Sequence, residues 1–188
     1  GASDPARLIA KYLADSGKRV VLIDSNKSFI ETAKKEGLEA FSTNIYDDDL
    51  TDNIELNDVG YLIAMTGSDA VNDFAMDSLS NVFGEHGAYR LATSKEIRTN
   101  NSEYKEQFFS PKDDYFNLSE AFRDNPKIHE VAINSEEAYN TMLSKLSNES
   151  RSVLLFVKKS DTIYLIPEFE KSKQSKENCT LIYLGKNL

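Results

Sequence analysis

The sequence predicts an α/β protein, with a doubly wound parallel sheet in the first half followed by a small α+β module. Over residues 4–93, short β-branched runs alternate with stretches of helical periodicity. This alternation is typical of parallel strands joined by crossover helices. From about residue 94 the sequence becomes polar and contains several Asn and Lys residues, which indicates a boundary. We therefore expect one domain over residues 1–98 and a second over residues 99–188.

Hydrophobic patterning assigns each element of the first half in turn. Asp4 can cap a helix with Pro5 in its first turn, and apolar residues recur on one face until Gly17 ends the pattern. Residues 19–24 are nearly all apolar until Asp24, as expected of a strand buried on both faces. The remaining predicted elements are a helix over 26–36, a strand over 38–42, a short helix over 46–53, a strand over 59–65, a helix over 69–83 and a strand over 89–92.

The second half carries the signals of a small module that mixes strands with a helix. Asn134 and Glu137 form a capping pair, which predicts a helix running to residue 146. A polar turn over residues 158–161 between two apolar runs is a hairpin signal. The predicted strands cover residues 127–133, 153–157, 162–166 and 179–184.

Composition and charge argue against several functions. Lys+Arg 22 against Asp+Glu 31 gives a formal net charge of -9, so we expect no basic surface for nucleic acid or for anionic lipid. No run approaches the ~18 apolar residues of a membrane span, and the N-terminus lacks a signal-peptide pattern. Cys179 is the one cysteine, which leaves no internal disulfide. We expect a cytoplasmic chain that is not itself inserted in a membrane.

Polar residues follow the predicted strands of the first half at the point where each strand ends. Asp24 ends one strand, Thr43 and Asn44 follow the next, and Thr66 follows the third, with Asp69 opening the next helix. Because the carboxyl ends of parallel strands lie at one edge of a sheet, these side chains should gather where ligands bind in such folds. Each residue alone could simply cap a helix, but their convergence favours a binding site.

The opening residues partly match the G-x-G-x-x-G/A turn of dinucleotide-binding folds. Gly1 occupies the first glycine position, Ser3 the second and Ala6 the permitted third. Asp24 follows about twenty residues later, where a carboxylate can accept hydrogen bonds from ribose hydroxyls. The sequence therefore predicts NAD(H) or an adenine nucleotide as ligand, in preference to NADP, because the carboxylate would repel a second phosphate.

The pattern shows no strand before Gly1. A dinucleotide-binding fold has its central strand there, and neighbouring strands would otherwise lack hydrogen-bond partners. Either the sequence begins one strand late, or residues 1–3 belong to a tag and the match is accidental. In the first case we expect a sheet that is rearranged, completed by another chain, or left with an exposed edge.

A resemblance to a known family rests on several short segments taken in order. These are Gly1 with Ala6 and Arg7, residues 20–26, residues 37–40, Thr43 with Asn44, residues 64–66, Asp69 and Asn72. Over about residues 1–93 the chain resembles a TrkA-N domain, also called a KTN or RCK domain. Such domains are the cytosolic nucleotide-binding regulators of bacterial potassium channels, potassium transporters and cation/proton antiporters. The second half is similar in outline to the small module that follows in antiporter tails.

The resemblance implies a Rossmann-like fold with a site for NAD(H) or an adenine nucleotide. Asp24 would then bind ribose, Arg7 would face a phosphate, and the edge at Thr66 would hold the rest of the nucleotide. Two positions depart from the family pattern, since Ser3 replaces the second glycine and Asn44 replaces the usual Asp. The candidate cofactor-binding residues are Gly1, Ser3, Ala6, Arg7, Asp24, Ser25, Asn26, Thr43, Asn44, Thr66 and Asp69.

The function implied by the resemblance is regulatory. We expect a domain that couples nucleotide binding to ion transport, in a monovalent cation/proton antiporter or a potassium transport system. Its partners would be the transmembrane portion of the transporter, at the cytoplasmic face of the inner membrane, and a second copy of this chain. A homodimer is favoured over a monomer by the apolar face of the helix over 69–83, which carries Val71, Phe74, Ala75, Leu79 and Val82.

Two other chemistries are weighed against this interpretation. A short NAD-dependent oxidoreductase would need a proton donor such as a Tyr/Lys pair, and none stands at a recognisable spacing, so we expect no catalysis. A divalent cation could be bound by Asp47, Asp48, Asp49 and Asp52. The helix dipole alone favours acidic residues in a first turn, so we expect no resident metal.

Overall fold

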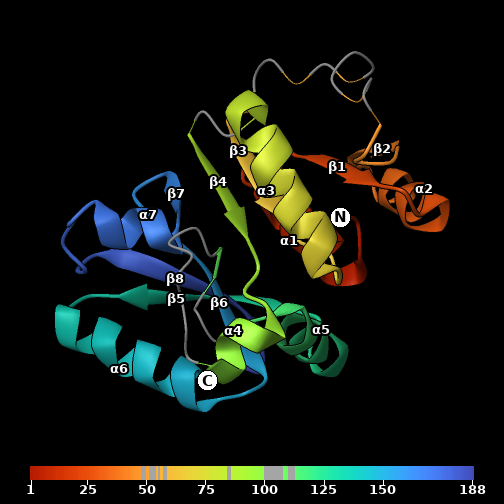
Figure 1. The fold of residues 1–188 in the computed structure, drawn as a ribbon. Coiled ribbons are helices and arrows are strands. Elements are labelled where there is room, and N and C mark those ends of the chain that lie inside the picture. The colour runs from red at the N-terminus through yellow and green to blue at the C-terminus, as the bar shows by residue number, and fades with distance from the viewer. Residues whose placement is uncertain are drawn as a thin grey trace. The chain divides into compact units, whose positions relative to one another are not determined.

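The structure of the chain is a computed structural model. It describes residues 1–47, 50, 54, 56, 59–83, 86–99, 108–109 and 113–188, without the side chains of residues 82 and 83. The chain divides into two compact units, Gly1–Arg90 and Leu91–Leu188, whose elements are labelled in Figure 1. The domain boundary expected after residue 98 stays a prediction, since much of the polar segment on which it rests, residues 100–107, lies outside the described residues.

The first unit alternates helices and strands, as the sequence predicts. The predicted helix over 69–83 coincides with the observed one, and the other predicted helices and strands that can be compared differ from the observed ones by a few residues. The short helix predicted over 46–53 lies mostly outside the described residues. The elements are α1 (Asp4–Asp15), β1 (Val21–Asp24), α2 (Lys27–Lys35), β2 (Glu39–Ser42), β3 (Tyr61–Ala64), α3 (Asp69–Phe83) and β4 (Gly87–Arg90).

The strands of this unit form parallel pairs. β1 pairs with β2, and β3 pairs with β4, both in parallel register. In the described part of the chain the pairs are two separate two-stranded sheets, because β1 and β3 are not hydrogen-bonded to each other. The predicted fold class, α/β with parallel strands joined by helices, is confirmed.

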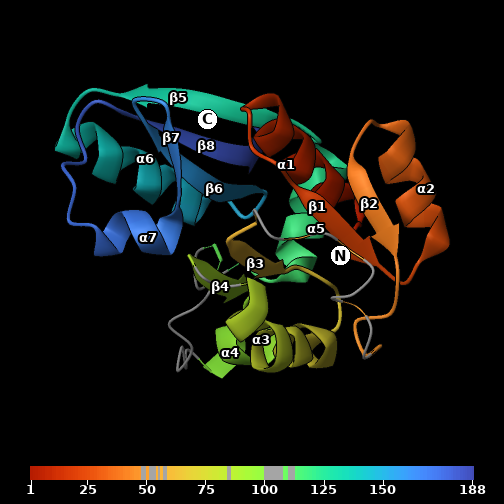
Figure 2. The ribbon, with the colours of Figure 1, turned by 90° about the horizontal axis from the view of Figure 1, so that it is seen from above.

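Helices and loops bury both faces of the β1–β2 pair. Leu22 and Ala40 point to the face covered by Ala10 of α1 and by Ile30 of α2, in one buried cluster. Figure 2 shows α1 beside β1 and α2 beside β2. The alternate residues of β1 and β2 belong to a second cluster with residues of β3 and α3, made of Val21, Ile23, Phe41, Leu62 and Leu79 around Leu50, Ile54 and Leu56. Strand pairs buried on both faces explain the apolar runs in the sequence.

Local chemistry fixes the helix ends that lead into and out of β1. Asn26 caps α2, since its Oδ1 accepts a hydrogen bond from the Ser28 amide at 3.0 Å. Gly17 and Gly37 follow α1 and α2 with φ of 81°, a left-handed conformation that glycine adopts without steric cost. Glycine turns therefore precede β1 and β2, and the Asn26 cap follows the carboxyl end of β1.

The second unit is an antiparallel sheet covered by helices. The predicted strands are all present, in the order β5-β8-β6-β7, and neighbouring strands run antiparallel. Three helices of this unit were not predicted from the sequence, namely α4, α5 and α7. The elements are α4 (Ser94–Thr99), α5 (Tyr115–Asp124), β5 (Ile128–Ile133), α6 (Glu136–Asn148), β6 (Ser152–Lys159), β7 (Thr162–Leu165), α7 (Ile166–Lys171) and β8 (Cys179–Gly185).

The N-cap predicted for α6 is wrong by one residue. Ser135, and not Asn134, is the N-cap, because its hydroxyl accepts a hydrogen bond from the Ala138 amide at 3.1 Å. Serine and asparagine are about equally favoured at this position. Adjacent cap residues of similar preference cannot be ranked from the sequence alone.

The central strands β6 and β8 form the core of the second unit. On one face, Leu181 and Tyr183 pack in a buried cluster with Tyr139 of α6 and Phe169 of α7. The other face contacts α5 and Phe108, whose ring centroid lies 6.0 Å from that of Phe156. Burial on both faces explains why residues 153–157 read as a continuous apolar run.

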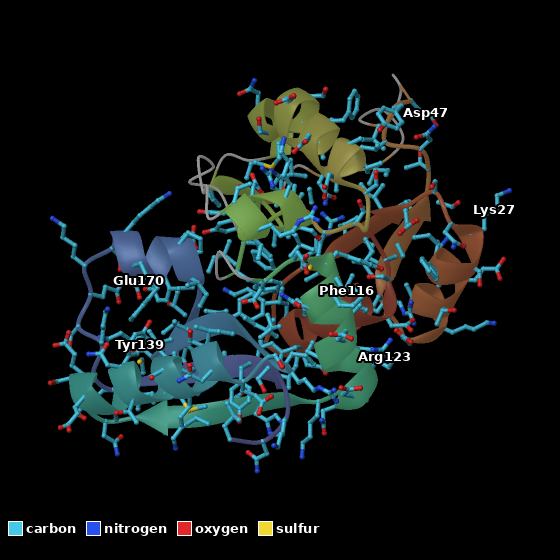
Figure 3. The ribbon with its side chains drawn as sticks, turned by 60° about the horizontal axis from the view of Figure 1, so that its bottom comes forward. Lys27, Asp47, Phe116, Arg123, Tyr139 and Glu170 are labelled. Carbon is cyan, nitrogen blue, oxygen red and sulfur yellow. The ribbon has the colours of Figure 1, made fainter. Side chains whose placement is uncertain are left out.

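Tyr139 places a phenol inside this core. Its hydroxyl donates to Glu170 Oε1 at 3.0 Å, and Lys176 Nζ lies 3.4 Å from Glu170 Oε2. Figure 3 labels Tyr139 on α6 and Glu170 on α7. Burial raises the pKa of the Tyr139 phenol, and the neighbouring Glu170 carboxylate raises it further.

The free energy of unfolding is expected to fall above about pH 10 because of Tyr139. An exposed tyrosine ionises there, while folded Tyr139 stays neutral, so the unfolded state binds fewer protons and stability drops as the pH rises. This residue contributes up to about 1.4 kcal/mol per pH unit. The free energy of unfolding is measured in urea from about pH 8 to about pH 11, a range that spans the pKa of an exposed tyrosine. It should fall less steeply with pH in Tyr139→Phe than in the wild type. Equal slopes in the two proteins would contradict the assignment.

Cys179 begins β8 and is also buried, with 5% of its surface exposed. Its Sγ donates to the Lys176 carbonyl at 3.4 Å. Burial raises the pKa of the thiol, and the positive charge of Lys159 opposes this. The thiol is therefore protonated and covered in the folded protein.

Candidate functional site

Three segments of the first unit meet at the carboxyl ends of β1 and β3. The Ala2 amide donates to Asp24 Oδ2 at 2.8 Å, which joins the start of the chain to the end of β1. Gly1 lies against the residues that follow β3, since a Cβ added to it would stand 2.9 Å from the Met65 carbonyl oxygen. This close approach requires glycine at position 1. The predicted residues Gly1, Asp24 and Thr66 are thus brought together.

The Asp24 carboxylate organises this meeting point and keeps acceptor capacity. Oδ2 accepts from the Ala2 amide, and Oδ1 accepts from the Asn26 amide at 2.8 Å. The Thr43 amide donates to the Asp24 carbonyl at 3.2 Å, so the segment after β2 lies beside it. An ionised carboxylate offers about four lone-pair sites. Asp24 can therefore accept further hydrogen bonds from ligand hydroxyls while holding both backbone amides.

Ser3, and not Asp4 as predicted, stands at the N-cap of α1, and its side chain makes no cap hydrogen bond. The residue is 7% exposed, and its Oγ is buried with no hydrogen-bond partner among the described residues. A buried hydroxyl without a partner is costly. It lies at a helix N-terminus, where free amides and the helix dipole favour an anion. The N-terminus of α1 is therefore suited to bind an anion such as a phosphate group.

Arg7 is engaged by the protein itself. Its Nη1 donates to the Ala2 carbonyl at 2.9 Å, its Nε to Glu36 Oε2 at 3.0 Å and its Nη2 to Asp4 Oδ1 at 2.7 Å. The side chain is 10% exposed. Glu36 was not predicted as a partner, because it lies at the C-terminal end of α2 and Arg7 reaches it only in the folded unit.

Asn72 ties the segment after β3 to helix α3. Its Oδ1 accepts from the Thr66 amide at 3.0 Å and from Thr66 Oγ1 at 2.8 Å, and its Nδ2 donates to the Thr66 carbonyl at 3.0 Å. Asn72 is 3% exposed. In the sequence, Asn72 stood out only as part of the family resemblance, and it was not among the candidate ligand-binding residues. It orients Thr66 at the site.

The remaining candidate residues have mainly local roles. Asn26 caps α2, and Asn44 Oδ1 accepts from the Tyr46 amide at 3.2 Å, which closes a turn. Ala6 is buried in α1, while Ser25 is exposed next to Asp24. Asp69 begins α3. None of these local contacts tests whether the residues bind a ligand, so that role stays a prediction.

Replacing Asn72 with Ala is expected to destabilise the protein by about 1–3 kcal/mol, because it removes the partners of a part-buried backbone amide and carbonyl. The measurement is the free energy of unfolding in urea. Asn44→Ala is a matched control, since Asn44 is exposed and accepts one local hydrogen bond. An effect of Asn72→Ala no larger than that of the control would show that the Thr66 contacts carry little stability.

Within the described ranges, no three or more His, Cys, Asp or Glu side chains are grouped so that they could hold a metal ion. The acidic group weighed as a cation site cannot be assessed, because Asp48, Asp49 and Asp52 lie outside those ranges. No helix in the described part of the chain is long and apolar enough to cross a membrane.

Fold and site together define the class of protein. Parallel strand pairs covered by helices, and a carboxylate at a strand end beside the segment that enters α1, are features of a Rossmann-like nucleotide-binding domain. The TrkA-N domain family matches residues 1–108, more than half of the chain, and the chain belongs to this family. TrkA-N domains are nucleotide-binding regulatory domains typical of potassium transport and antiporter systems, and they generally bind NAD(H)-type nucleotides. No curated protein matches the chain.

Proposed function

We propose that the first unit is a regulatory domain that binds NAD(H) or an adenine nucleotide and couples this binding to ion transport. One observation carries the proposal, namely the meeting of Gly1, Asp24 and Thr66 at the carboxyl ends of β1 and β3. Such an edge is where ligands bind in α/β folds. The polar groups there match the two ends of a nucleotide, a ribose and its phosphates.

The ligand lies with its ribose hydroxyls on Asp24 and a phosphate at the N-terminus of α1. Backbone amides at the N-terminus of α1 donate to the phosphate oxygens. The Asp24 carboxylate accepts from ribose hydroxyls and repels a 2′-phosphate, so NAD(H) binds more tightly than NADP(H).

Calorimetric titration of the 188-residue chain tests the proposal with NAD, NADH, ATP and NADP as probes. We expect saturable binding of at least one of the first three, and weaker binding of NADP by about tenfold or more, since like-charge placement costs over 1 kcal/mol. Heat signals no larger than buffer dilution for all four probes would remove the nucleotide function.

The transporter context rests on the family. We propose that the partner is the transmembrane portion of a monovalent cation/proton antiporter or a potassium transport system, at the cytoplasmic face of the membrane. Nucleotide binding would favour one arrangement of the regulatory domains and so bias the transporter. Co-purification of the chain with such a membrane protein, strengthened or weakened by the bound nucleotide, is the expected result. Co-purification unchanged by nucleotide would contradict the coupling.

We propose a homodimer as the assembled state. Val71, Phe74 and Leu79 of α3 are only partly buried within the unit, which leaves apolar surface for a second copy. Light scattering over a concentration series should give the mass of two chains. A mass that stays at the 21.2 kDa of one chain up to high micromolar concentration would contradict the dimer.

We propose binding without catalysis. The groups at the site are a carboxylate, hydroxyls and backbone amides already engaged in hydrogen bonds, which suits ligand binding. NADH mixed with the protein and candidate carbonyl substrates should keep its absorbance. Steady NADH consumption that depends on a substrate would favour the rival function, a short NAD-dependent oxidoreductase.

A further inference from the structure

Both peptide groups that flank Ala2 are held by side chains. The Ala2 amide donates to Asp24 Oδ2 at 2.8 Å, and the Ala2 carbonyl accepts from Arg7 Nη1 at 2.9 Å. Ala2 itself is fully buried. Because the next residue is Ser3, these two hydrogen bonds set the direction in which the chain enters α1. Arg7 and Asp24 therefore act on the same short segment from opposite sides.

The Arg7 guanidinium forms ion pairs with two carboxylates. Asp4 Oδ1 lies 2.7 Å from Nη2, and Glu36 Oε2 lies 3.0 Å from Nε. The Arg7 side chain is 10% exposed, while those of Asp4 and Glu36 are 58% and 43% exposed. A phosphate that reached this guanidinium would stand beside both carboxylates, which repel it. Arg7 is thus poorly placed to serve as a phosphate ligand.

We infer that Arg7 is a positioning residue, which orders residues 1–3 for nucleotide binding through the Ala2 carbonyl and does not touch the ligand. The inference rests on the proposed nucleotide function. Its physical basis is preorganisation: a segment fixed before binding does not lose conformational freedom on binding. The planar guanidinium can make all three contacts at once, whereas a lysine ammonium on a flexible stem cannot.

Two substitutions separate positioning from direct phosphate contact. Lysine is a good phosphate ligand, so a direct contact would largely survive Arg7→Lys and fail in Arg7→Met. Positioning predicts that both variants bind more weakly, by about tenfold, as expected for the loss of a charged hydrogen bond. The affinities are measured by calorimetry on the full chain.

A second measurement needs no ligand. The ¹⁵N relaxation of the Ala2 amide should show a rigid backbone in the wild type and faster motion in both Arg7 variants. Arg19 provides the matched control, because it forms a similar two-point ion pair with Glu39. Its Nε and Nη2 lie 3.0 Å and 2.7 Å from the Glu39 carboxylate oxygens, near the amino ends of β1 and β2 and away from the site. Arg19→Lys and Arg19→Met should change neither the Ala2 amide nor the affinities.

The outcomes are distinct. Weaker binding of NAD by a similar factor in Arg7→Lys and Arg7→Met, together with a mobile Ala2 amide, supports the inference. Retained NAD affinity in Arg7→Lys would make Arg7 a phosphate ligand and overturn it. An Ala2 amide that stays rigid in both variants would overturn it as well. If the wild type does not bind NAD, the proposed function fails, and the amide measurement alone decides whether Arg7 orders residues 1–3.

Discussion

Asp24→Ala is expected to weaken NAD binding by about 100-fold or to abolish it, a loss of ~3 kcal/mol that combines two charged hydrogen bonds to ribose. The substitution also removes the acceptors of the Ala2 and Asn26 amides, so the segment that faces the phosphate loses its anchor. Calorimetric titration with NAD measures the effect. This is the largest change in affinity expected from a single side chain of the site.

Two further variants test this expectation. Asp24→Asn keeps one acceptor oxygen but no charge, so we expect an intermediate affinity for NAD and a smaller preference for NAD over NADP. Glu39→Ala removes a carboxylate at the start of β2, at the end of the strand pair away from Asp24. It should leave the affinities for NAD and NADP unchanged. Unchanged NAD affinity in Asp24→Ala would remove Asp24 from the binding site.

Phe156→Ala is expected to give the largest loss of stability, about 3–5 kcal/mol, because it opens a cavity in a packed core. Phe156 lies on the central strand β6 and is fully buried. Its ring contacts Phe108 in an edge-to-face arrangement. The free energy of unfolding is measured in urea, together with the slope of the transition, since a changed slope would mean that the compactness of the native or denatured state has changed or that the transition is no longer two-state.

Phe116→Ala is the matched control for this experiment. The same side chain is removed from the same unit, but Phe116, labelled in Figure 3, is 62% exposed. Substitutions at exposed positions usually change the free energy of unfolding by no more than about 0.5 kcal/mol. Similar losses in Phe156→Ala and Phe116→Ala would contradict the described packing of β6.

The elements that could be predicted from sequence are those with a strong periodic signal. Helix α3 and the strands of both units carry such signals over enough residues to be recognised. Helix α7 has six residues and begins at Ile166-Pro167, so it is too short to show a helical period. It forms at the end of the hairpin, where Glu168 Oε2 accepts from the Leu165 amide at 3.3 Å.

Site residues could be predicted where their position in the sequence is itself the signal. They could not be predicted where their role depends on a contact that forms only in the folded protein. Asp24 was found from its spacing to the opening glycine, and the structure places it against Ala2. Asn72 and Glu36 were not on the list of site residues, because their roles depend on the folded positions of Thr66 and Arg7. Tertiary hydrogen bonds between segments far apart in sequence leave no periodic pattern to read.

Cys179 gives the protein a built-in reporter of local opening. The chain has one cysteine, and burial keeps its thiol protonated and covered at the start of β8. The thiolate is the nucleophile that attacks an alkylating reagent, and the reagent must reach it, so modification should proceed only when the start of β8 opens. The rate of thiol labelling under native conditions therefore measures how often the second unit opens. A nucleotide that alters this rate would reveal that the two halves of the chain are energetically coupled.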